Sequence, residues 1–418
     1  MQSDVSLARV KQFPVLMWIL LFGAFITRGS FYMVWPFLAI ILYQRFGISA
    51  TEVGLILSSA AFVSVFIGFL GGTLSDRIGR HKLMYVSGVL YVFSFSLLAV
   101  AHSLMGYVVV ITLCSIAKAL WEPPTSALIG DIVPDKKTRE LAMQARYFVV
   151  NVGAAVGPMA GVWFGLTGQQ SSFFITAGAF AFLLLILTWG FKQHGKIGHQ
   201  HAVEQTPFKQ TFSILKQDKL LQCLIIANVL CMFIYAQMDS SLIQYLTRAE
   251  VPELVVLISA MIVANSATIV CFQFLLLKMM ANLALETRIQ FALVLLALSQ
   301  FWFALNPLEW FWGWVGAAIL MSFAEAILFP TMNVHIDRLA PSHLRGAYFG
   351  AASFYSLGYA IAPLGGGMIL DALGGGWLFT IAGGLCAIVF YLYGILDKLP
   401  RPDFVSTEIE NITAEKTY

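Results

Sequence analysis

Residues 71 to 82, Gly-Gly-Thr-Leu-Ser-Asp-Arg-Ile-Gly-Arg-His-Lys, form a short charged stretch between two long apolar runs. The run before it, 53–74, has no charge after Glu52, and the run after it, 83–101, has none at all. Each run is long enough to cross a bilayer as a helix at ~1.5 Å per residue. A chain that leaves the membrane and re-enters it at once needs glycine for the reversal and favours cations on the basic face. The sequence therefore predicts a tight turn between two membrane helices.

The composition is that of an integral membrane protein. Hydrophobic residues make up 59% of the 418 positions and charged residues only 11%, whereas soluble proteins are ~45–50% apolar. Twelve spans of ~20 residues use roughly 240 residues, which leaves little for a separate soluble domain. The cysteines fall inside apolar runs without paired spacing, so we interpret them as core residues and not as disulfides or metal ligands: Cys114, Cys223, Cys231, Cys271 and Cys386.

Six apolar runs precede a polar segment and six follow it. The predicted spans are 13–43, 53–74, 83–101, 107–131, 145–166, 172–191, 219–247, 253–278, 288–306, 309–334, 348–370 and 376–397. This pattern predicts an all-α membrane protein with 12 transmembrane helices in two six-helix bundles. We expect an N-terminal bundle at 1–191, a cytoplasmic linker at 192–218, a C-terminal bundle at 219–397 and a cytoplasmic tail at 398–418.

The polar segment from Lys192 to Lys219 carries five lysines and the histidines His194, His199 and His201. A histidine cluster can bind metal, but no cysteine or regular ligand spacing completes a site, so we interpret it as a solvated linker with neither metal nor cofactor. Within it, a short helix starting at Pro207 is expected to lie along the membrane surface, with Phe208, Phe212 and Leu215 on one face.

The cations predict the orientation of the chain. One set of alternate loops, with both termini, holds twenty Lys and Arg residues, and the opposite loops hold only Arg45 and Arg248. By the positive-inside rule, both termini and the linker face the cytoplasm. We expect the membrane to be a bacterial cell inner membrane.

The two halves repeat each other at an offset of 205 or 206 positions. Matched glycines, prolines and charges at one offset argue for two parallel six-helix repeats with a substrate path between them. The pairs include Gly153 and Gly358, Pro158 and Pro363, Gly161 and Gly366, Pro124 and Pro330, and Asp131 and Asp337.

Ionisable residues inside the spans are the strongest functional signal, because each costs ~2.5–3.5 kcal/mol at mid-bilayer. In the first half, Arg28 has Tyr32 and Trp35 on its helix face, and Lys118 lies one turn before Glu122. One interpretation is a buried structural ion cluster in which Glu122 pairs with Arg28. The other is a polar cavity that binds a substrate and a proton.

The second half contributes two acids to this hypothesis. Asp239 lies one turn after Tyr235 and close to Gln237, and Glu325 lies five residues before Pro330. No cation lies within a helical turn of Glu325, and burial without a partner favours the protonated form of a carboxyl group. Glu325 is therefore our first candidate for the proton carrier and Asp239 the second. Asp131 and Asp337, near the cytoplasmic ends, are interpreted as helix-end or gate charges.

The stretch at 71–82 resembles the signature between the second and third helices of the major facilitator superfamily. The matching residues are Gly72, Leu74, Asp76, Arg77, Gly79, Arg80 and Lys82. The resemblance implies a secondary transporter that works by alternating access. It also implies that the gating motif of Gly72, Asp76, Arg77, Gly79 and Arg80 helps to hold the cytoplasmic face closed.

Three shorter runs resemble subfamilies. The run 120–128, with Glu122 before two prolines, is similar to a bacterial multidrug and proton antiporter branch. The run 151–161 resembles the fifth-helix signature of proton antiporters, although its glycine ridge also fits plain helix packing. The run 324–330 looks like the tenth helix of proton-dependent oligopeptide transporters, in which Glu325 would correspond to a functional glutamate. That family's paired glutamates in the first helix are missing here.

These observations predict a proton-coupled secondary transporter of small amphipathic organic solutes, and not an enzyme. The leading hypothesis is a multidrug-type exporter, and the alternative is proton-coupled uptake of peptides or amino acids. The expected partners are a small-molecule substrate, protons and the lipid bilayer, without nucleic acid. The expected substrate-binding residues are Arg28, Tyr32, Trp35, Lys118, Glu122, Tyr235 and Gln237.

Overall fold

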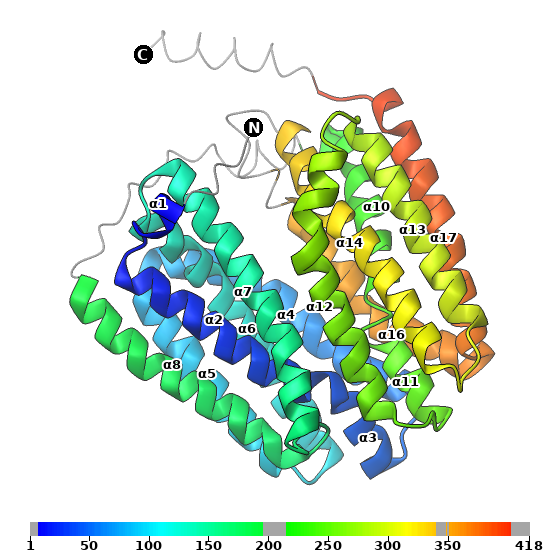
Figure 1. Cartoon of the computed structure of the whole chain (residues 1–418), viewed down its shortest axis with the longest axis horizontal. Helices are drawn as coiled ribbons and strands as arrows, with labels where there is room; N and C mark the ends of the chain where they lie inside the picture. The colour runs from blue at the N-terminus through cyan, green and yellow to red at the C-terminus, as the bar shows by residue number, and fades with distance from the viewer. Residues whose placement is uncertain (1–6, 195–214, 340–347, 349–350, 403–418) are drawn as a thin grey trace.

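The computed structural model describes residues 7–194, 215–339, 348 and 351–402, which form helices and turns and contain no strand. Figure 1 shows two helical bundles side by side. Ten helices of the described residues are long and apolar enough to cross a membrane. Two further passages bring the number to twelve. One is α7, and the other consists of α10 and α11 with a break between them. The predicted all-α fold is confirmed.

The N-terminal bundle contains α2 to α8. Its elements are α2 (Val15–Val34), the 3-10 turn η1 (Trp35–Phe37), α3 (Leu38–Phe46), α4 (Ala50–Ile78), α5 (Arg80–Val100), α6 (Leu104–Ile132), α7 (Lys136–Trp163) and α8 (Phe173–His194), preceded by the short α1 (Leu7–Val10). The C-terminal bundle contains α10 (Lys219–Tyr235), α11 (Ser241–Arg248), α12 (Leu254–Met279), α13 (Leu285–Leu305), α14 (Phe311–Leu339), α16 (Ser356–Leu373) and α17 (Gly375–Ile395).

The turn predicted at 71–82 is sharper than expected. Residues 71–78 stay helical, and the chain reverses at Gly79 alone, whose φ of +94° suits a residue without a Cβ. Arg80 then begins α5 and pairs with Asp131 of α6 at 2.6 Å. Gly72, Asp76 and Arg77 lie in α4, but their side chains are not among those that the structure describes.

Two predictions for the linker also fall outside the described residues. They concern the histidines after residue 194 and the start of the surface helix at Pro207.

Two predicted spans are broken where the sequence suggested continuous helices. The first span changes to a 3-10 turn at Trp35–Phe37, where Pro36 cannot donate a backbone hydrogen bond. The seventh is interrupted by turns from Ala236 to Ser240, between α10 and α11. Broken helices at membrane depth are tolerated where they border a cavity, and both breaks do so here.

The repeated glycines allow the same close helix packing in both bundles. A Cβ built at Gly153 of α7 would lie 2.7 Å from the carbonyl oxygen of Phe25 in α2. Its counterpart Gly358 of α16 would place a Cβ 1.9 Å from the carbonyl oxygen of Val229 in α10. Each bundle therefore packs its fifth passage against its first by direct backbone contact, as expected for a duplicated fold.

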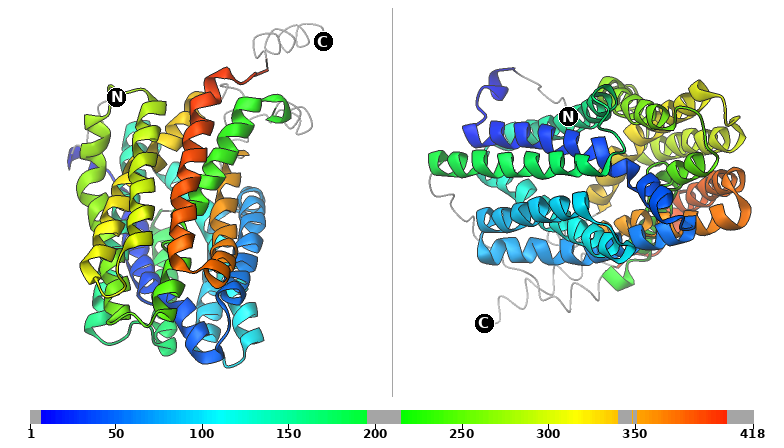
Figure 2. Two further views of the ribbon diagram at one scale, coloured as in Figure 1. Left: turned by 90° about the vertical axis from the view of Figure 1, so that its right-hand side faces the viewer. Right: turned by 90° about the horizontal axis from the view of Figure 1, so that it is seen from below.

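The bundles meet mainly through two helix pairs, α4 with α16 and α7 with α12, and α11 also contacts α3 and α4. Figure 1 shows these helices drawing together toward the end that carries α3 and α11, opposite the chain termini, and Figure 2 shows the bundles from the side and from below. Three consecutive glycines of α16 face three different helices. A Cβ at Gly365 would meet the Phe233 ring of α10, one at Gly366 would meet Ser241 of α11, and one at Gly367 would meet Ala50 of α4.

Candidate functional site

A cavity of about 410 Å³ lies between the two bundles. The N-terminal bundle contributes residues of α2, η1, α4 and α6 to its wall, and the C-terminal bundle contributes residues of α10, α11, α12 and α16 and of the break between α10 and α11. Most of the lining is apolar or aromatic, including Phe31, Tyr32, Trp35, Met238 and Met261. A wall of this kind accepts an organic solute through its apolar body and leaves orientation to a few polar groups.

Among the described residues, three charged side chains line this cavity. Arg28 and Lys118 belong to the N-terminal bundle and Asp239 to the C-terminal bundle. The cavity therefore has two cations on one side and one acid on the other. Charges at this depth are costly unless they face one another or water, so their shared cavity explains how the fold retains them.

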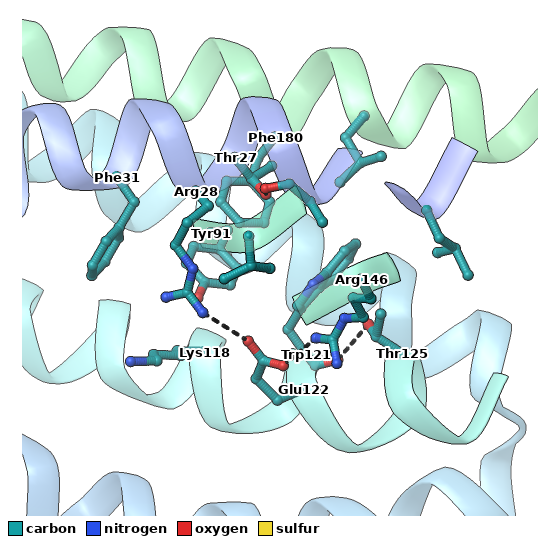
Figure 3. Close-up of a pocket in the computed structure, with 14 residues that line it drawn as sticks. Thr27, Arg28, Phe31, Tyr91, Lys118, Trp121, Glu122, Thr125, Arg146 and Phe180 are labelled. Atoms are coloured by element: carbon teal, nitrogen blue, oxygen red, sulfur yellow. Dashed lines mark hydrogen bonds and ion pairs between the residues drawn. The ribbon is translucent and has the colours of Figure 1, made fainter. Parts of the chain in front are cut away.

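A smaller pocket of about 50 Å³ lies inside the N-terminal bundle (Figure 3). Glu122 is its only acid in the described lining, and it faces two arginines. Arg146 of α7 donates to Glu122 Oε2 at 2.5 Å and to Ser126 Oγ at 3.1 Å. Arg28 of α2 is more distant, with Nη2 4.0 Å from Glu122 Oε1. The sequence suggested Arg28 as the partner of Glu122, but the closer partner is Arg146.

Arg28 and Lys118 line both the small pocket and the central cavity. The Arg28 guanidinium lies 5.7 Å from the Tyr32 ring centre, and the Lys118 ammonium lies 5.7 Å from that of Phe31. In the part of the chain that the structure describes, no carboxylate lies within ion-pair distance of Lys118. Aromatic rings attract cations but do not neutralise them, so this wall keeps positive charge toward the cavity.

Asp239 lies in the turn between α10 and α11. The Tyr359 hydroxyl of α16 donates to Asp239 Oδ2 at 2.8 Å, and both residues line the central cavity. A single neutral donor orients the carboxylate without compensating its charge. Asp239 is thus available to a proton or to a cationic group of a solute in the cavity.

Glu325 of α14 is only 7% exposed and does not belong to the described lining of the cavity. The Asn265 amide of α12 donates to Glu325 Oε2 at 2.7 Å and to Ser322 Oγ at 3.0 Å. Within the described residues, no Lys or Arg forms an ion pair with Glu325. A buried carboxyl group with neutral partners gains and loses a proton without breaking a salt bridge.

The predicted site residues divide into three groups. Arg28, Tyr32, Trp35, Lys118 and Asp239 line the central cavity. Glu122 lies in the adjoining small pocket. Outside both linings are Glu325, Tyr235 and Gln237.

Tyr235 and Gln237 pack inside the C-terminal bundle. The Tyr235 ring lies 4.9 Å from that of Phe329, one turn after Glu325 on α14. The Gln237 amide is buried and donates to the carbonyl oxygens of Phe233 at 3.0 Å and Ala362 at 3.4 Å.

Three further residues complete the site. Arg146 lies at the edge of the predicted span 145–166, and its charge is a signal that the sequence does carry. Tyr359 and Asn265 are uncharged, and a single tyrosine or asparagine in an apolar run gives no comparable signal. Among the described residues, no group of three or more His, Cys, Asp or Glu side chains could hold a metal ion.

Comparison with known proteins agrees with this fold. The sequence model of the Major Facilitator Superfamily matches residues 20–355. The chain therefore belongs to the Major Facilitator Superfamily. It is a multi-pass membrane transporter and not an enzyme, because the members of this family that it resembles are transporters.

Individual relatives are distant. An uncharacterized MFS-type transporter of Bacillus subtilis, YqjV, is 28% identical over 90% of this chain and 92% of its own. A Na⁺, Li⁺, K⁺/H⁺ antiporter of Planococcus maritimus is 25% identical over 92% and 96%, and the multidrug resistance protein MdtH of Shigella dysenteriae is 23% identical over 84% and 83%. A solved POT family transporter in complex with 5-aminolevulinic acid has a TM-score of 0.75 at 18% identity, over 91% of this chain and 96% of that one. This last likeness shows the fold alone.

Proposed function

We propose that the protein is a proton-coupled transporter that exports small amphipathic organic solutes in exchange for protons. The observation that carries the proposal is the central cavity of about 410 Å³, in which Arg28, Lys118 and Asp239 interrupt an aromatic and methionine-rich wall. Such a wall binds the apolar body of a solute, and the charged groups bind its polar end. The cavity lies between two pseudo-equivalent bundles, where alternating access presents it to each side in turn.

Glu325 is the proposed proton carrier. It is buried, its described partners are neutral, and its partner Asn265 belongs to α12, a helix that lines the cavity. Asp239 is the second carrier, because it faces the cavity directly and can hold either a proton or a cationic group of the solute. Competition between a proton and a solute for one carboxylate is the simplest physical basis for antiport.

Antiport and export are supported by the relatives whose names include a cation/proton antiporter and a multidrug resistance protein. The excess of Lys and Arg in alternate loops supports an inner-membrane location with both termini in the cytoplasm. In this orientation the predicted gating motif at 71–82 lies on the cytoplasmic side, where Arg80 and Asp131 tie α5 to α6.

Uptake of peptides or amino acids with protons is the second candidate. The observation that favours it is the charge distribution of the cavity, with Arg28 and Lys118 on one wall and Asp239 on the other. A zwitterion could place its carboxylate near the two cations and its amine near the acid.

Purified protein in proteoliposomes with an imposed pH gradient separates these functions. Substrate flux and proton flux are recorded together for a panel of lipophilic cations, amphipathic anions and dipeptides. The proposal predicts that a panel member moves in the direction opposite to the protons. Movement of dipeptides together with protons replaces it with the second candidate, and substrate flux that does not respond to the pH gradient removes proton coupling altogether.

A further inference from the structure

At the end opposite the termini, α4 and α16 pack against each other by direct backbone contact, and both helices line the cavity. A Cβ at Gly54 would lie 2.2 Å from the carbonyl oxygen of Pro363, and the Leu364 N–H donates to Ser58 Oγ at 3.0 Å. A Cβ at Gly367, farther along α16, would lie 2.4 Å from the carbonyl oxygen of Ala50. The two helices belong to different bundles, so any opening of the cavity at this end has to separate them.

Asp371 binds across this seam. Its Oδ1 accepts from the Ala50 N–H at 3.1 Å, and its Oδ2 accepts from the Thr51 N–H at 2.7 Å and the Thr51 hydroxyl at 2.6 Å. Ala50 and Thr51 are the first residues of α4, whose N–H groups have no acceptor within their own helix and which carry the positive end of the helix dipole. A carboxylate of the C-terminal bundle therefore caps a helix of the N-terminal bundle.

The same helix start also has a cap of its own. Ser49 Oγ accepts from the Glu52 N–H at 3.1 Å, and Glu52 Oε2 accepts from the Ser49 N–H at 2.7 Å, which is a complete capping box. α4 therefore needs no help from the other bundle to start. The bonds from Asp371 add a connection between bundles to a helix end that is already stable.

Arg248 of α11 contacts the segment just before Ser49. Its Nη2 donates to the carbonyl oxygen of Ile48 at 3.0 Å, and its guanidinium carbon lies 4.5 Å from the Tyr43 ring centre. Asp371 and Arg248 thus hold the start of α4 and the residues before it from two different helices of the C-terminal bundle.

We call the side of the protein on which Ser49 and Asp371 lie the Ser49 face. We propose that Asp371 is a positioning residue of the transport cycle and that its bonds to α4 set how often the cavity opens on the Ser49 face. Asp371 is exposed, so water can solvate its carboxylate and the freed N–H groups when the bundles separate. A contact that opens in every cycle has to be breakable, and charge-assisted bonds at a wet edge meet this need better than buried ones.

Side-specific thiol labelling tests the proposal. The reporter is Ser115→Cys, which lines the central cavity, in a chain whose five native cysteines are replaced. A membrane-impermeant thiol reagent is applied to vesicles of each orientation. Asp371→Ala removes three charge-assisted bonds, so the labelling rate from the Ser49 face should rise about tenfold and the rate from the opposite face should fall.

Glu52→Ala is the matched control, because it removes a carboxylate that binds the same helix end from within the N-terminal bundle. Its labelling rates should stay at those of the parent. A steric variant gives an independent check: Gly367→Ala should push α4 and α16 apart and raise the rate from the Ser49 face. Gly384→Ala, where a Cβ would meet nothing within 4 Å, should leave it unchanged.

Equal labelling of Asp371→Ala and the parent, or an equal rise in Glu52→Ala, would overturn the proposal. If Asp371→Ala does not fold, two milder variants replace it: Asp371→Asn weakens all three bonds, and Thr51→Val removes only the bond from the Thr51 hydroxyl. Both must give smaller increases in the same direction, and no increase in either variant overturns the proposal as well. The proposal rests on alternating access of the cavity. Labelling needs neither a substrate nor a pH gradient. A failure of the proposal about Asp371 is therefore distinguishable from a failure of proton-coupled export.

Discussion

Arg146 donates a 2.5 Å hydrogen bond to Glu122 and thereby joins the middle of α7 to the double-proline region of α6. Arg28 approaches the other carboxylate oxygen at 4.0 Å. The Glu122 carboxylate thus faces two arginines, and its contact with Arg146 is the shorter one. Replacing Glu122 leaves two cations facing each other without a counter-charge.

We therefore expect Glu122→Ala to destabilise the protein by ~1–2 kcal/mol, a moderate value because the Glu122 side chain is 40% exposed. The temperature of half-unfolding in mild detergent measures the effect. Glu52→Ala, which also removes a carboxylate but from a helix end at the surface, should lower this temperature less. A Glu122→Ala protein as stable as the parent would show that the cluster contributes nothing to the fold.

Glu325→Gln should abolish proton-driven transport and leave substrate exchange or binding measurable. Glutamine keeps the size and the hydrogen bond with Asn265 but cannot release a proton. Counterflow in proteoliposomes without a pH gradient measures exchange, and pH-driven flux measures coupling. Glu309→Gln, at an exposed site, is the control. Loss of both activities, or of neither, would mean that Glu325 is not the coupling group.

Arg28→Ala should weaken the binding of anionic or carbonyl-bearing solutes about tenfold, because it removes one of two cations from the cavity wall. Affinity is read from the solute concentration that half-saturates exchange. Arg28→Lys keeps the charge and should recover part of the loss. Unchanged affinity across anionic, neutral and cationic solutes would exclude Arg28 from the binding site.

Gly157→Ala should reduce the yield of folded protein severely. The added Cβ would lie 2.1 Å from the carbonyl oxygen of Gly29, and a backbone oxygen in a packed helix cannot move aside as a side chain can. The monodisperse fraction in size-exclusion chromatography measures the yield. Gly178→Ala, where a Cβ would meet nothing within 4 Å, should behave as the parent does. Equal yields for the two variants would mean that α2 and α7 adjust freely.

The fold was largely predictable because a bilayer allows few solutions. Apolar runs of about 20 residues become helices, and the chain reverses within the charged stretch at 71–82, at Gly79. What the sequence did not specify was how the helices are interrupted. The break at 236–240 contains no proline, and four of its five residues line a cavity that exists only after both bundles have assembled.

The site was predictable only where charge marked it. Arg28, Lys118 and Asp239 stood out because charges are costly in a membrane, and they now share one cavity. Pairing was harder to predict, because Glu122 and Arg146 lie 24 positions apart on different helices. Asp371 gave no signal, since an acid at a predicted span end is ordinary, and its role depends on a helix start 320 residues earlier in the chain.

The three glycines 365–367 of α16 have a practical consequence for inhibition. The first two face helices of their own bundle, whereas Gly367 faces Ala50 across the seam. When the cavity opens on the Ser49 face, the space beside Gly367 becomes free while the contacts of the other two glycines stay intact. A flat ligand that fills this space would act as a wedge and arrest the transporter open on that face, whatever solute it carries.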